Sequence, residues 1–414
     1  MERRRRSSDT VAVKRWICFI AAVWLQSING TNFVFSNYSS DLKNVLGINQ
    51  IKLNSLAVAS DLGKTLGWVS GVVCMILPTW AVLAIAVSLG IVGYGVQWLM
   101  LAHIIHPLAY WQVYMLCFVA GNSICWFNTV SFRAAIENFP TNRGIASGLS
   151  TSYSGLSAVI YTSLSSIVDR GHPSSYLLLN SIVPAVVAII SAILLHVSHS
   201  KKAKEDEGGR RKLILFTVIT IVTAVYSILL EFLPHKNRGV EGIYMSVLFI
   251  LLLAPLSIPL WLAFGYTTTI RKVTNYSSTP TQTPTASPEI HKNNSEEEYS
   301  STHAISENFL SIDEETKHYK PLDIEPGVQQ QVTERKSSPS LGEEHGIRDL
   351  LVSIDFWLYY LVYFCGGTVG LVYINNLGQI LQSLGYSKTP VLVSLVSSFG
   401  FFGRIASGFP DYIQ

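Results

Sequence analysis

Residues 15–36 read RWICFIAAVWLQSINGTNFVFS, a long run of apolar side chains with only a few amides and hydroxyls among them. A helix needs about 20 predominantly apolar residues to cross the hydrocarbon core of a bilayer. Similar blocks recur along the chain, which is 49% hydrophobic and 14% charged, whereas soluble chains carry roughly 25% charged residues. The blocks are long and continuous, which favours helices over the short alternating strands of a barrel. We therefore predict an all-α, polytopic bundle of transmembrane helices.

The apolar blocks predict ten membrane spans. They are Trp16–Ser36, Asn54–Leu77, Ala81–His103, Tyr110–Ser131, Arg143–Val168, Tyr176–Val197, Leu213–Leu233, Gly242–Phe264, Phe356–Asn376 and Pro390–Phe409. The second and fifth blocks hold charged or many small residues, so we expect them to line the bundle.

Basic residues gather in alternate loops. They precede the first span at residues 3–6 and 14–15, follow the fourth at Arg133 and Arg143, and follow the sixth at residues 201–212. Loops rich in Lys and Arg stay in the cytosol. The pattern therefore predicts a cytosolic N-terminus and a cytosolic segment 266–347.

Residues 266–347 are rich in Ser, Thr, Pro and Glu and hold 13 acidic against 7 basic residues. Such a composition buries too little apolar surface to offset the entropy of ordering, which predicts a disordered cytosolic linker. It contains Ser287-Pro288, Ser338-Pro339 and Thr283-Pro284, so kinases or adaptors are candidate partners. The domain division follows: a six-helix bundle in 1–200, a basic loop and two helices in 201–265, the linker in 266–347, and two helices in 348–414.

The last two spans look like a second copy of the first two. Residues 34–47 align with residues 372–385, and residues 66–71 align with residues 402–408. A six-span unit that restarts after a long loop is the parallel repeat of major facilitator transporters. We therefore expect a major-facilitator bundle whose C-terminal half is incomplete in this sequence.

The segment from Arg15 to Ser39, together with Ser60-Asp61-Leu-Gly63-Lys64, resembles the plant nodulin-like family of the major facilitator superfamily. Phe402-Gly403-Arg404 and Gly408-Phe-Pro-Asp411 resemble that family's second-half signature. The resemblance implies a membrane carrier. Two features depart from it: family members continue for several more spans, and the basic loop usual after the second helix is reduced to residues 78–80.

Two charged pairs are candidates for coupling or gating. Asp61 and Lys64 lie inside the second span, where a charge is costly and a functional candidate, and their i, i+3 spacing lets them pair. A structural ion pair explains them equally well. Arg133 and Glu137 lie one turn apart at the end of the fourth span, where an interfacial pair is the simpler interpretation.

Arg404 lies deeper in its span, and Asp411 is close enough in sequence to be its partner or a helix cap. Both are further coupling or gating candidates. An anionic solute would need a cation in the membrane, and Lys64 and Arg404 are the basic residues placed there. Organic anions are therefore a weakly favoured substrate class.

Amide side chains predict a polar path. Gln26, Asn29 and Asn32 recur every three residues on one face of the first span, and Asn122 and Asn128 lie in the fourth. Amides facing lipid are unfavourable, so these side chains should point into the bundle. They could bind substrate or join helices to one another.

Small residues predict close helix packing. Gly63, Gly67 and Gly71 form a ladder in the second span, and Gly403 and Gly408 lie in the tenth. Glycine at such positions lets transmembrane helices approach closely.

The sequence favours a secondary transporter that moves a small solute by alternating access. The alternative is a non-transporting scaffold or receptor that acts through residues 266–347. A nucleotide site at Gly63-Lys64-Thr65 fails because Val58 stands where a phosphate loop needs glycine. We find no group of residues arranged for catalysis or metal binding. We therefore expect that the chain is not an enzyme and has no cofactor and no nucleic-acid partner. The lipid bilayer is its expected partner.

Overall fold

The computed structural model describes residues 2–169, 172–198, 209–232, 238–262, 347–386, 389–406 and 408. The chain divides into two compact units, one formed by residues 1–275 with 362–414 and the other by residues 276–361. Of the second unit, the described part is α14 (Ile347–Val352) and the first residues of α15, where Trp357 Nε1 donates to the Leu351 carbonyl. Most of the expected linker lies outside the described residues.

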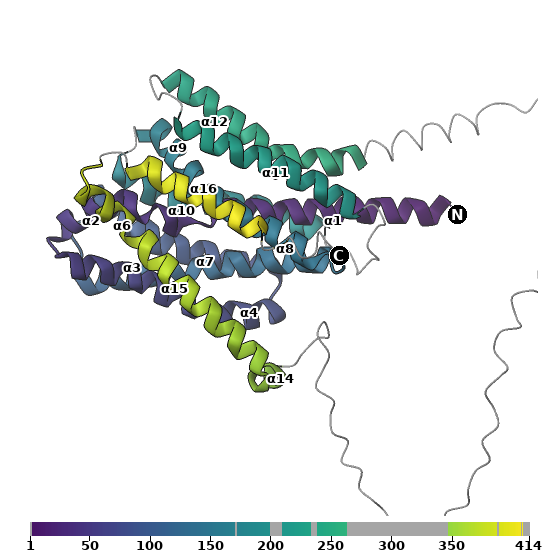
Figure 1. Ribbon diagram of the computed structural model, residues 1–414, viewed down its shortest axis with the longest axis horizontal. Helices are drawn as coiled ribbons and strands as arrows, with labels where there is room; N and C mark the ends of the chain where they lie inside the picture. The colour runs from purple at the N-terminus through teal and green to yellow at the C-terminus, as the bar shows by residue number, and fades with distance from the viewer. Residues whose placement is uncertain are drawn as a thin grey trace, which may run out of the picture. The chain divides into compact units, whose positions relative to one another are not determined.

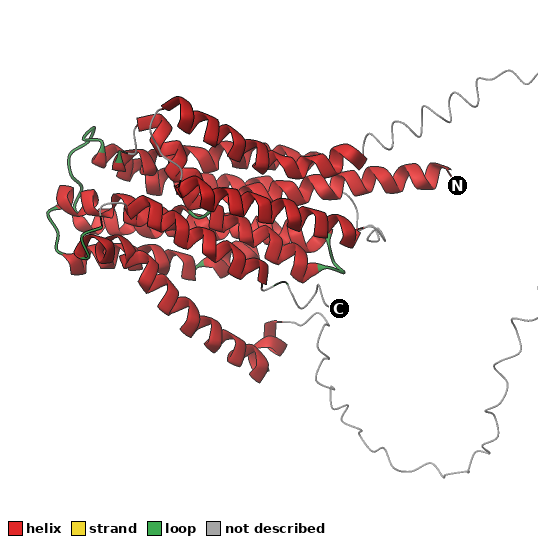
Figure 2. Ribbon diagram, turned by 45° about the horizontal axis from the view of Figure 1, so that its top comes forward, coloured by secondary structure: helices red, strands yellow, loops and turns green. Residues whose placement is uncertain are grey.

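The first unit consists of helices that run side by side over most of their length (Figures 1 and 2). Their bounds are α1 (Glu2–Ile28), η1 (Thr31–Val34), α2 (Phe35–Leu46), α3 (Gln50–Thr65), α4 (Gly67–Ile76), α5 (Thr79–Gly90), η2 (Ile91–Gly95), α6 (Val96–Leu101), α7 (Tyr110–Asn138), α8 (Arg143–Ser152), η3 (Tyr153–Leu156), α9 (Ser157–Asp169), α10 (Pro173–Ser198), α11 (Gly209–Phe232), α12 (Arg238–Leu253), η4 (Ala254–Leu256), α15 (Ile354–Ser383) and α16 (Thr389–Ala406).

The prediction of an all-α polytopic bundle is confirmed, and helix forms most of the described part of each of the ten expected spans. Seven stretches in the described part of the chain are long and apolar enough to cross a membrane. The second, fifth and tenth spans are not among the seven. The second is divided at Leu66 between α3 and α4, the fifth is interrupted by η3, and the tenth is the shorter apolar helix Val391–Ala406.

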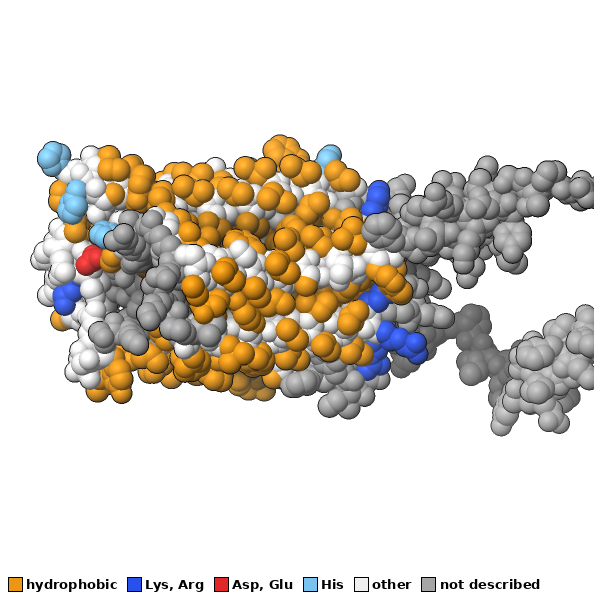
Figure 3. Space-filling model, turned by 90° about the horizontal axis from the view of Figure 1, so that it is seen from above, with side chains coloured by type: hydrophobic (Ala, Val, Ile, Leu, Met, Phe, Trp, Pro, Cys, Tyr) orange, Lys and Arg blue, Asp and Glu red, His pale blue; other side chains and the backbone are white. Residues whose placement is uncertain are grey.

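Apolar side chains cover the long flank of the bundle (Figure 3). Many large apolar side chains of the described residues are exposed, including Ile189, Ile193, Leu215 and Val222. A soluble protein rarely leaves contiguous apolar surface of this extent in water. The surface therefore matches the interior of a bilayer.

The first span differs from its prediction because α1 ends at Ile28, and the chain is not helical at Asn29 and Gly30. Glycine is a poor helix former, and here it is also required by space. A Cβ on Gly30 would lie 2.7 Å from the Ser157 side chain. Hydroxyls of α9 satisfy the freed backbone groups: Gly30 N donates to Ser157 Oγ, and Tyr161 Oη donates to the Ile28 carbonyl at 2.7 Å.

The third span contains a π-helical turn, η2, between α5 and α6. Gly93 lies against α7, where a Cβ would come within 2.7 Å of Ala120 Cα. The turn directs the buried Tyr94 toward the break after α1, and its hydroxyl lies 2.7 Å from Thr31 Oγ1. Single π-helical turns in α-helices are frequent at functional sites.

Helices α3 and α7 are in backbone contact. A Cβ on Gly63 would overlap the Phe118 carbonyl, and one on Gly121 would overlap the Ser60 carbonyl. A Cβ on Gly67 would have more room, at 3.1 Å from Cys125 Sγ, and the space beside Gly71 is open. Two members of the predicted ladder thus lie at a close contact, while Gly71 does not.

Helices α15 and α16, which the sequence predicts to be a second repeat copy, pack on the first bundle. In α15, a Cβ on Gly378 would come within 2.9 Å of Ser36 Cβ on α2. In α16, Ser397 and Phe401 lie against Gly155, and the following Gly408 lies against Gly144 and Gly148. The space beside Gly403 is open, so the packing role predicted for that glycine is not seen in this structure.

Candidate functional site

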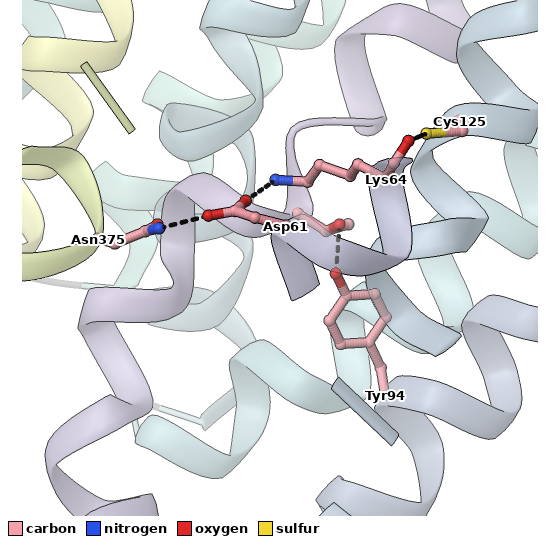
Figure 4. Close-up of polar contacts among 6 residues, drawn as sticks. Asp61, Lys64, Tyr94, Cys125 and Asn375 are labelled. Carbon is pink, nitrogen blue, oxygen red and sulfur yellow. Dashed lines mark hydrogen bonds and ion pairs between the residues drawn. The ribbon is translucent and has the colours of Figure 1, made fainter. Parts of the chain in front are cut away.

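Asp61 of α3 is the centre of a polar cluster inside the bundle (Figure 4). Lys64 Nζ lies 2.7 Å from one carboxylate oxygen, and Asn375 Nδ2 of α15 donates to the other at 2.9 Å. The side chains of Asp61 and Lys64 are about a quarter exposed. The carboxylate therefore receives one partner from its own helix and one from the second repeat copy.

A cavity of about 350 Å³, counting the space at its open side, adjoins this carboxylate. We call it the Asp61 cavity. Its lining comes from the first bundle and from α15: Asn32, Phe35, Tyr38, Leu56, Ala57, Ser60, Asp61, Tyr94, Gln97, Cys117, Ala120 and Asn375. Asp61 is the one charged residue in this lining, so the cavity carries a negative charge that Lys64 compensates from beside it.

Tyr94 also lines a second cavity. We call it the Asn180 cavity. Its lining is Asn29, Thr31, Val87, Gly90, Tyr94, Ser123, Phe127, Asn180, Ser181, Pro184 and Ala185. The hydrogen bond between Tyr94 and Thr31 thus joins a residue that lines both cavities to one that lines the second.

The predicted amides of α1 and α7 lie inside the bundle, and several join helices. Asn29 Nδ2 donates to Asn128 Oδ1 at 2.7 Å and to the Ile124 carbonyl at 3.1 Å. Asn122 Nδ2 donates to the Gly63 carbonyl of α3 at 2.9 Å. These contacts are those of interhelical bonds, whereas Asn32 lines the Asp61 cavity.

Several buried polar atoms have no hydrogen-bond partner in the described part of the chain. They are both amide atoms of Gln26 and Asn37, one oxygen of Asn29 and Asn180, and the hydroxyls of Ser36, Ser150, Ser397 and Ser398. Leaving a buried polar atom unpaired costs about 1–3 kcal/mol, so each is a candidate contact for a ligand or water.

Arg133 and Glu137 form an ion pair at 2.8 Å in which the two side chains are 39% and 56% exposed. Arg133 also bonds the Cys74 carbonyl at the end of α4. The pair lies eleven residues beyond Asn122, which is about 16 Å along the helix at 1.5 Å per residue. The structure does not bring it to the Asp61 cluster.

Arg404 of α16 places its guanidinium 5.6 Å from the ring centroid of Phe33, a cation–π distance. It does not line either cavity. Asp411, its expected partner, lies outside the described residues.

Several residues of the site were not predicted from the sequence. Tyr94 lies in the π-helical turn and Gln97 follows it, and the spacing of Gly90, Gly93 and Gly95 was the available signal. Asn180 stands four residues before Pro184, a spacing that frees a helix carbonyl.

Within the described ranges, no group of three or more His, Cys, Asp or Glu is placed to hold a metal ion.

The fold and the polar interior define an integral, multi-pass helical membrane protein. Comparison with known families then gives the group: the model described as Nodulin-like matches residues 15–260, and the model described as NFD4, C-terminal domain matches residues 340–414. This chain belongs to the Nodulin-like family.

The chain is 39% identical over 406 residues to Protein NUCLEAR FUSION DEFECTIVE 4 of Arabidopsis thaliana. The alignment covers 97% of this chain and 65% of that protein. The chain thus spans about two thirds of the length of this relative. No solved structure matches the chain.

Proposed function

We propose that this chain forms part of a secondary transporter that moves a small solute across a membrane by alternating access. The observation that carries the proposal is the Asp61 carboxylate, which borders a polar cavity and is held between Lys64 and Asn375. An ionisable residue in a membrane bundle is costly and marks solute or ion pathways. Asn375 comes from the second repeat copy, so the same carboxylate links both parts that alternating access would move.

The contact between α2 and α15 suits repeated opening. Besides Gly378 against Ser36, two polar pairs join these helices: Gln379 Nε2 donates to Ser39 Oγ and Gln382 Nε2 donates to Ser40 Oγ, both at 2.9 Å. Neutral hydrogen bonds contribute about 0.5–1.5 kcal/mol each, and water can replace them. In the α3–α7 contact, by comparison, the two backbones pack directly against each other. The contact between α2 and α15 is therefore the weaker of the two.

The charge distribution supports an N-terminus in the cytosol. Where α1 begins and α7 ends, the described side chains include seven cations: Lys14, Arg15, Arg133, Arg143, Arg210, Arg211 and Lys212. Where α2 ends and α3 begins, Lys43 and Lys52 are the cations described. The richer end faces the cytosol under the positive-inside rule. An epitope tag before Glu2 should be reached by antibody only after the membrane is permeabilised.

The flux assay has to identify the class of solute. Organic anions were favoured because Lys64 and Arg404 are cations in the membrane, but neither lines the Asp61 cavity. A panel should therefore hold anionic, cationic and neutral solutes. Kinases or adaptors that bind residues 266–347 remain part of the proposal as regulators of the carrier.

The test is solute flux into vesicles that contain the purified chain. Asp61→Asn and Lys64→Gln should abolish flux, because each leaves the other charge without its partner. Glu137→Gln, at the exposed pair of α7, is the matched control and should leave flux nearly unchanged. Flux that persists in both Asp61→Asn and Lys64→Gln contradicts the proposal. A function that survives these substitutions and is lost on deletion of 266–347 supports the scaffold alternative.

A further inference from the structure

We propose that the Asn180 cavity binds a monovalent alkali cation through oxygen ligands. The inference concerns binding alone and holds whether or not the chain carries a solute. It rests on four features of the cavity: two unpaired amide oxygens, one carbonyl freed by proline, a serine hydroxyl whose hydrogen is already used, and a lining without charge.

The two amide oxygens are Asn29 Oδ1 and Asn180 Oδ1. Both residues line the cavity, both are at least nine-tenths buried, and neither oxygen has a partner in the described part of the chain. Their orientation follows from the opposite atom of each amide. Asn29 Nδ2 donates to the Ile124 carbonyl and Asn180 Nδ2 to the Thr31 carbonyl at 3.4 Å. A carbonyl can only accept, so a flipped amide would lose these bonds.

Pro184 contributes a further acceptor. It lies inside α10 and lines the cavity together with Asn180. Proline has no backbone N–H, so the carbonyl four residues earlier, that of Asn180, lacks its usual helical donor. Asn180 therefore brings both a side-chain oxygen and a backbone oxygen to the same region.

The hydroxyls of the lining add further oxygen lone pairs. Ser123 Oγ donates to the Ala120 carbonyl of its own helix at 2.7 Å. Thr31 and Tyr94 share one hydrogen bond at 2.7 Å. A single water has two hydrogens to donate, whereas the cavity offers three acceptors that lack a donor: Asn29 Oδ1, Asn180 Oδ1 and the Asn180 carbonyl. This excess of acceptors over the hydrogens of one water favours a cation.

The end of α1 strengthens this preference. The helix ends at Ile28, and Asn29 and Thr31 just beyond it line the cavity. The C-terminus of a helix carries partial negative charge. In transporters with interrupted helices, unwound carbonyls and half-helix C-termini coordinate Na⁺.

Charge and size select the class of cation. No carboxylate is in the lining, whereas Ca²⁺ and Mg²⁺ sites draw on carboxylates. Burying two positive charges without a counter-charge is much costlier than burying one. The cavity has room for about one water-sized particle. These limits favour a single, dehydrated alkali ion over a divalent ion or an organic ammonium.

The test uses the full chain, purified in detergent, with thermal unfolding measured in NaCl, KCl or N-methylglucamine chloride at equal ionic strength. Because a ligand that binds only the folded state stabilises it, Na⁺ or K⁺ should raise the melting temperature in a saturable way. N-methylglucamine should not. Radioactive ²²Na⁺ binding then gives the stoichiometry directly.

Three variants make the test specific. Asn180→Leu keeps the size of the side chain but removes an oxygen ligand, and should weaken binding about tenfold or more. Pro184→Ala restores a donor to the Asn180 carbonyl, so it should weaken binding without lowering stability in N-methylglucamine. Asn122→Leu removes an amide with two hydrogen bonds outside the cavity, and should lower stability while preserving the Na⁺ effect.

Either of two outcomes overturns the proposal. One is the absence of any saturable difference between the alkali salts and N-methylglucamine in the unaltered chain. The other is an undiminished cation effect in both Asn180→Leu and Pro184→Ala. Because Pro184→Ala is expected to fold at least as well as the original chain, loss of folding in Asn180→Leu does not prevent a decision.

Discussion

Asn375 donates a hydrogen bond to the Asp61 carboxylate at 2.9 Å, although 314 positions separate the two residues in the chain. The bond joins α15, which begins the second repeat copy, to α3, which belongs to the first. Both residues line the same cavity. A carboxylate that accepts from Asn375 thus reports on whether α15 is docked on the first bundle.

Loss of this bond should loosen the docking of α15. A hydrogen bond to a charged group contributes about 1.5–3 kcal/mol, so Asn375→Leu should undock α15 in a measurable fraction of molecules. Ser40→Cys and Gln382→Cys replace two side chains in contact at 2.9 Å, and the rate at which a short bifunctional thiol reagent cross-links this cysteine pair measures docking. We expect the rate to fall several-fold in Asn375→Leu. An unchanged rate would show that the bond does not hold the helix.

The contact between α3 and α7 should be intolerant of any added side chain. Gly63→Leu forces a branched side chain against the Phe118 backbone, and overpacking typically costs about 1–3 kcal/mol, occasionally more. We expect Gly63→Leu to have a markedly lower melting temperature or to yield no monodisperse protein on purification. Gly71→Ala is the control from the same span, because the space beside Gly71 is open. Equal effects of the two substitutions would contradict the packing described here.

The break after α1 should depend on the hydroxyl of Tyr161. Tyr161→Phe leaves the Ile28 carbonyl without the donor seen at 2.7 Å, and a buried unsatisfied carbonyl costs about 1–3 kcal/mol. The expected result is a lower melting temperature with intact membrane insertion. Tyr110→Phe removes an exposed bond to the Lys52 carbonyl, so it should change stability little. A larger effect at Tyr110 than at Tyr161 would argue that the break is held by other groups.

The sequence predicts the spans well because apolar length is a property of consecutive residues. It also identifies the second and fifth spans as unusual, and both are interrupted helices in the structure. The i, i+3 spacing of Asp61 and Lys64 permits the ion pair that the structure forms. These features depend on local chain geometry alone.

The partners across helices could not be predicted in the same way. The first span was expected to be continuous, but contacts with Ser157 and Tyr161 of α9 satisfy a break inside it. The π-helical turn that directs Tyr94 to Thr31 depends on the fit of Gly93 against Ala120. Such contacts are set by tertiary packing, and the sequence gives only the glycines that allow them.

Arg133 and Asp61 should behave differently although both belong to i, i+3 or i, i+4 ion pairs. The Arg133–Glu137 pair is 39% and 56% exposed, and exposed helix pairs contribute about 0.3–0.5 kcal/mol. Glu137→Gln should therefore shift the melting temperature slightly, and salt should reduce even that shift. Asp61→Asn removes a less exposed charge with two partners and leaves Lys64 unpaired, which costs more.

Thermal unfolding of both variants at low and high salt separates the cases. We expect a loss of melting temperature in Asp61→Asn that salt does not change, and a small loss in Glu137→Gln that salt reduces. The reverse order would mean that the end of α7, and not the Asp61 cluster, holds the critical charges of the bundle.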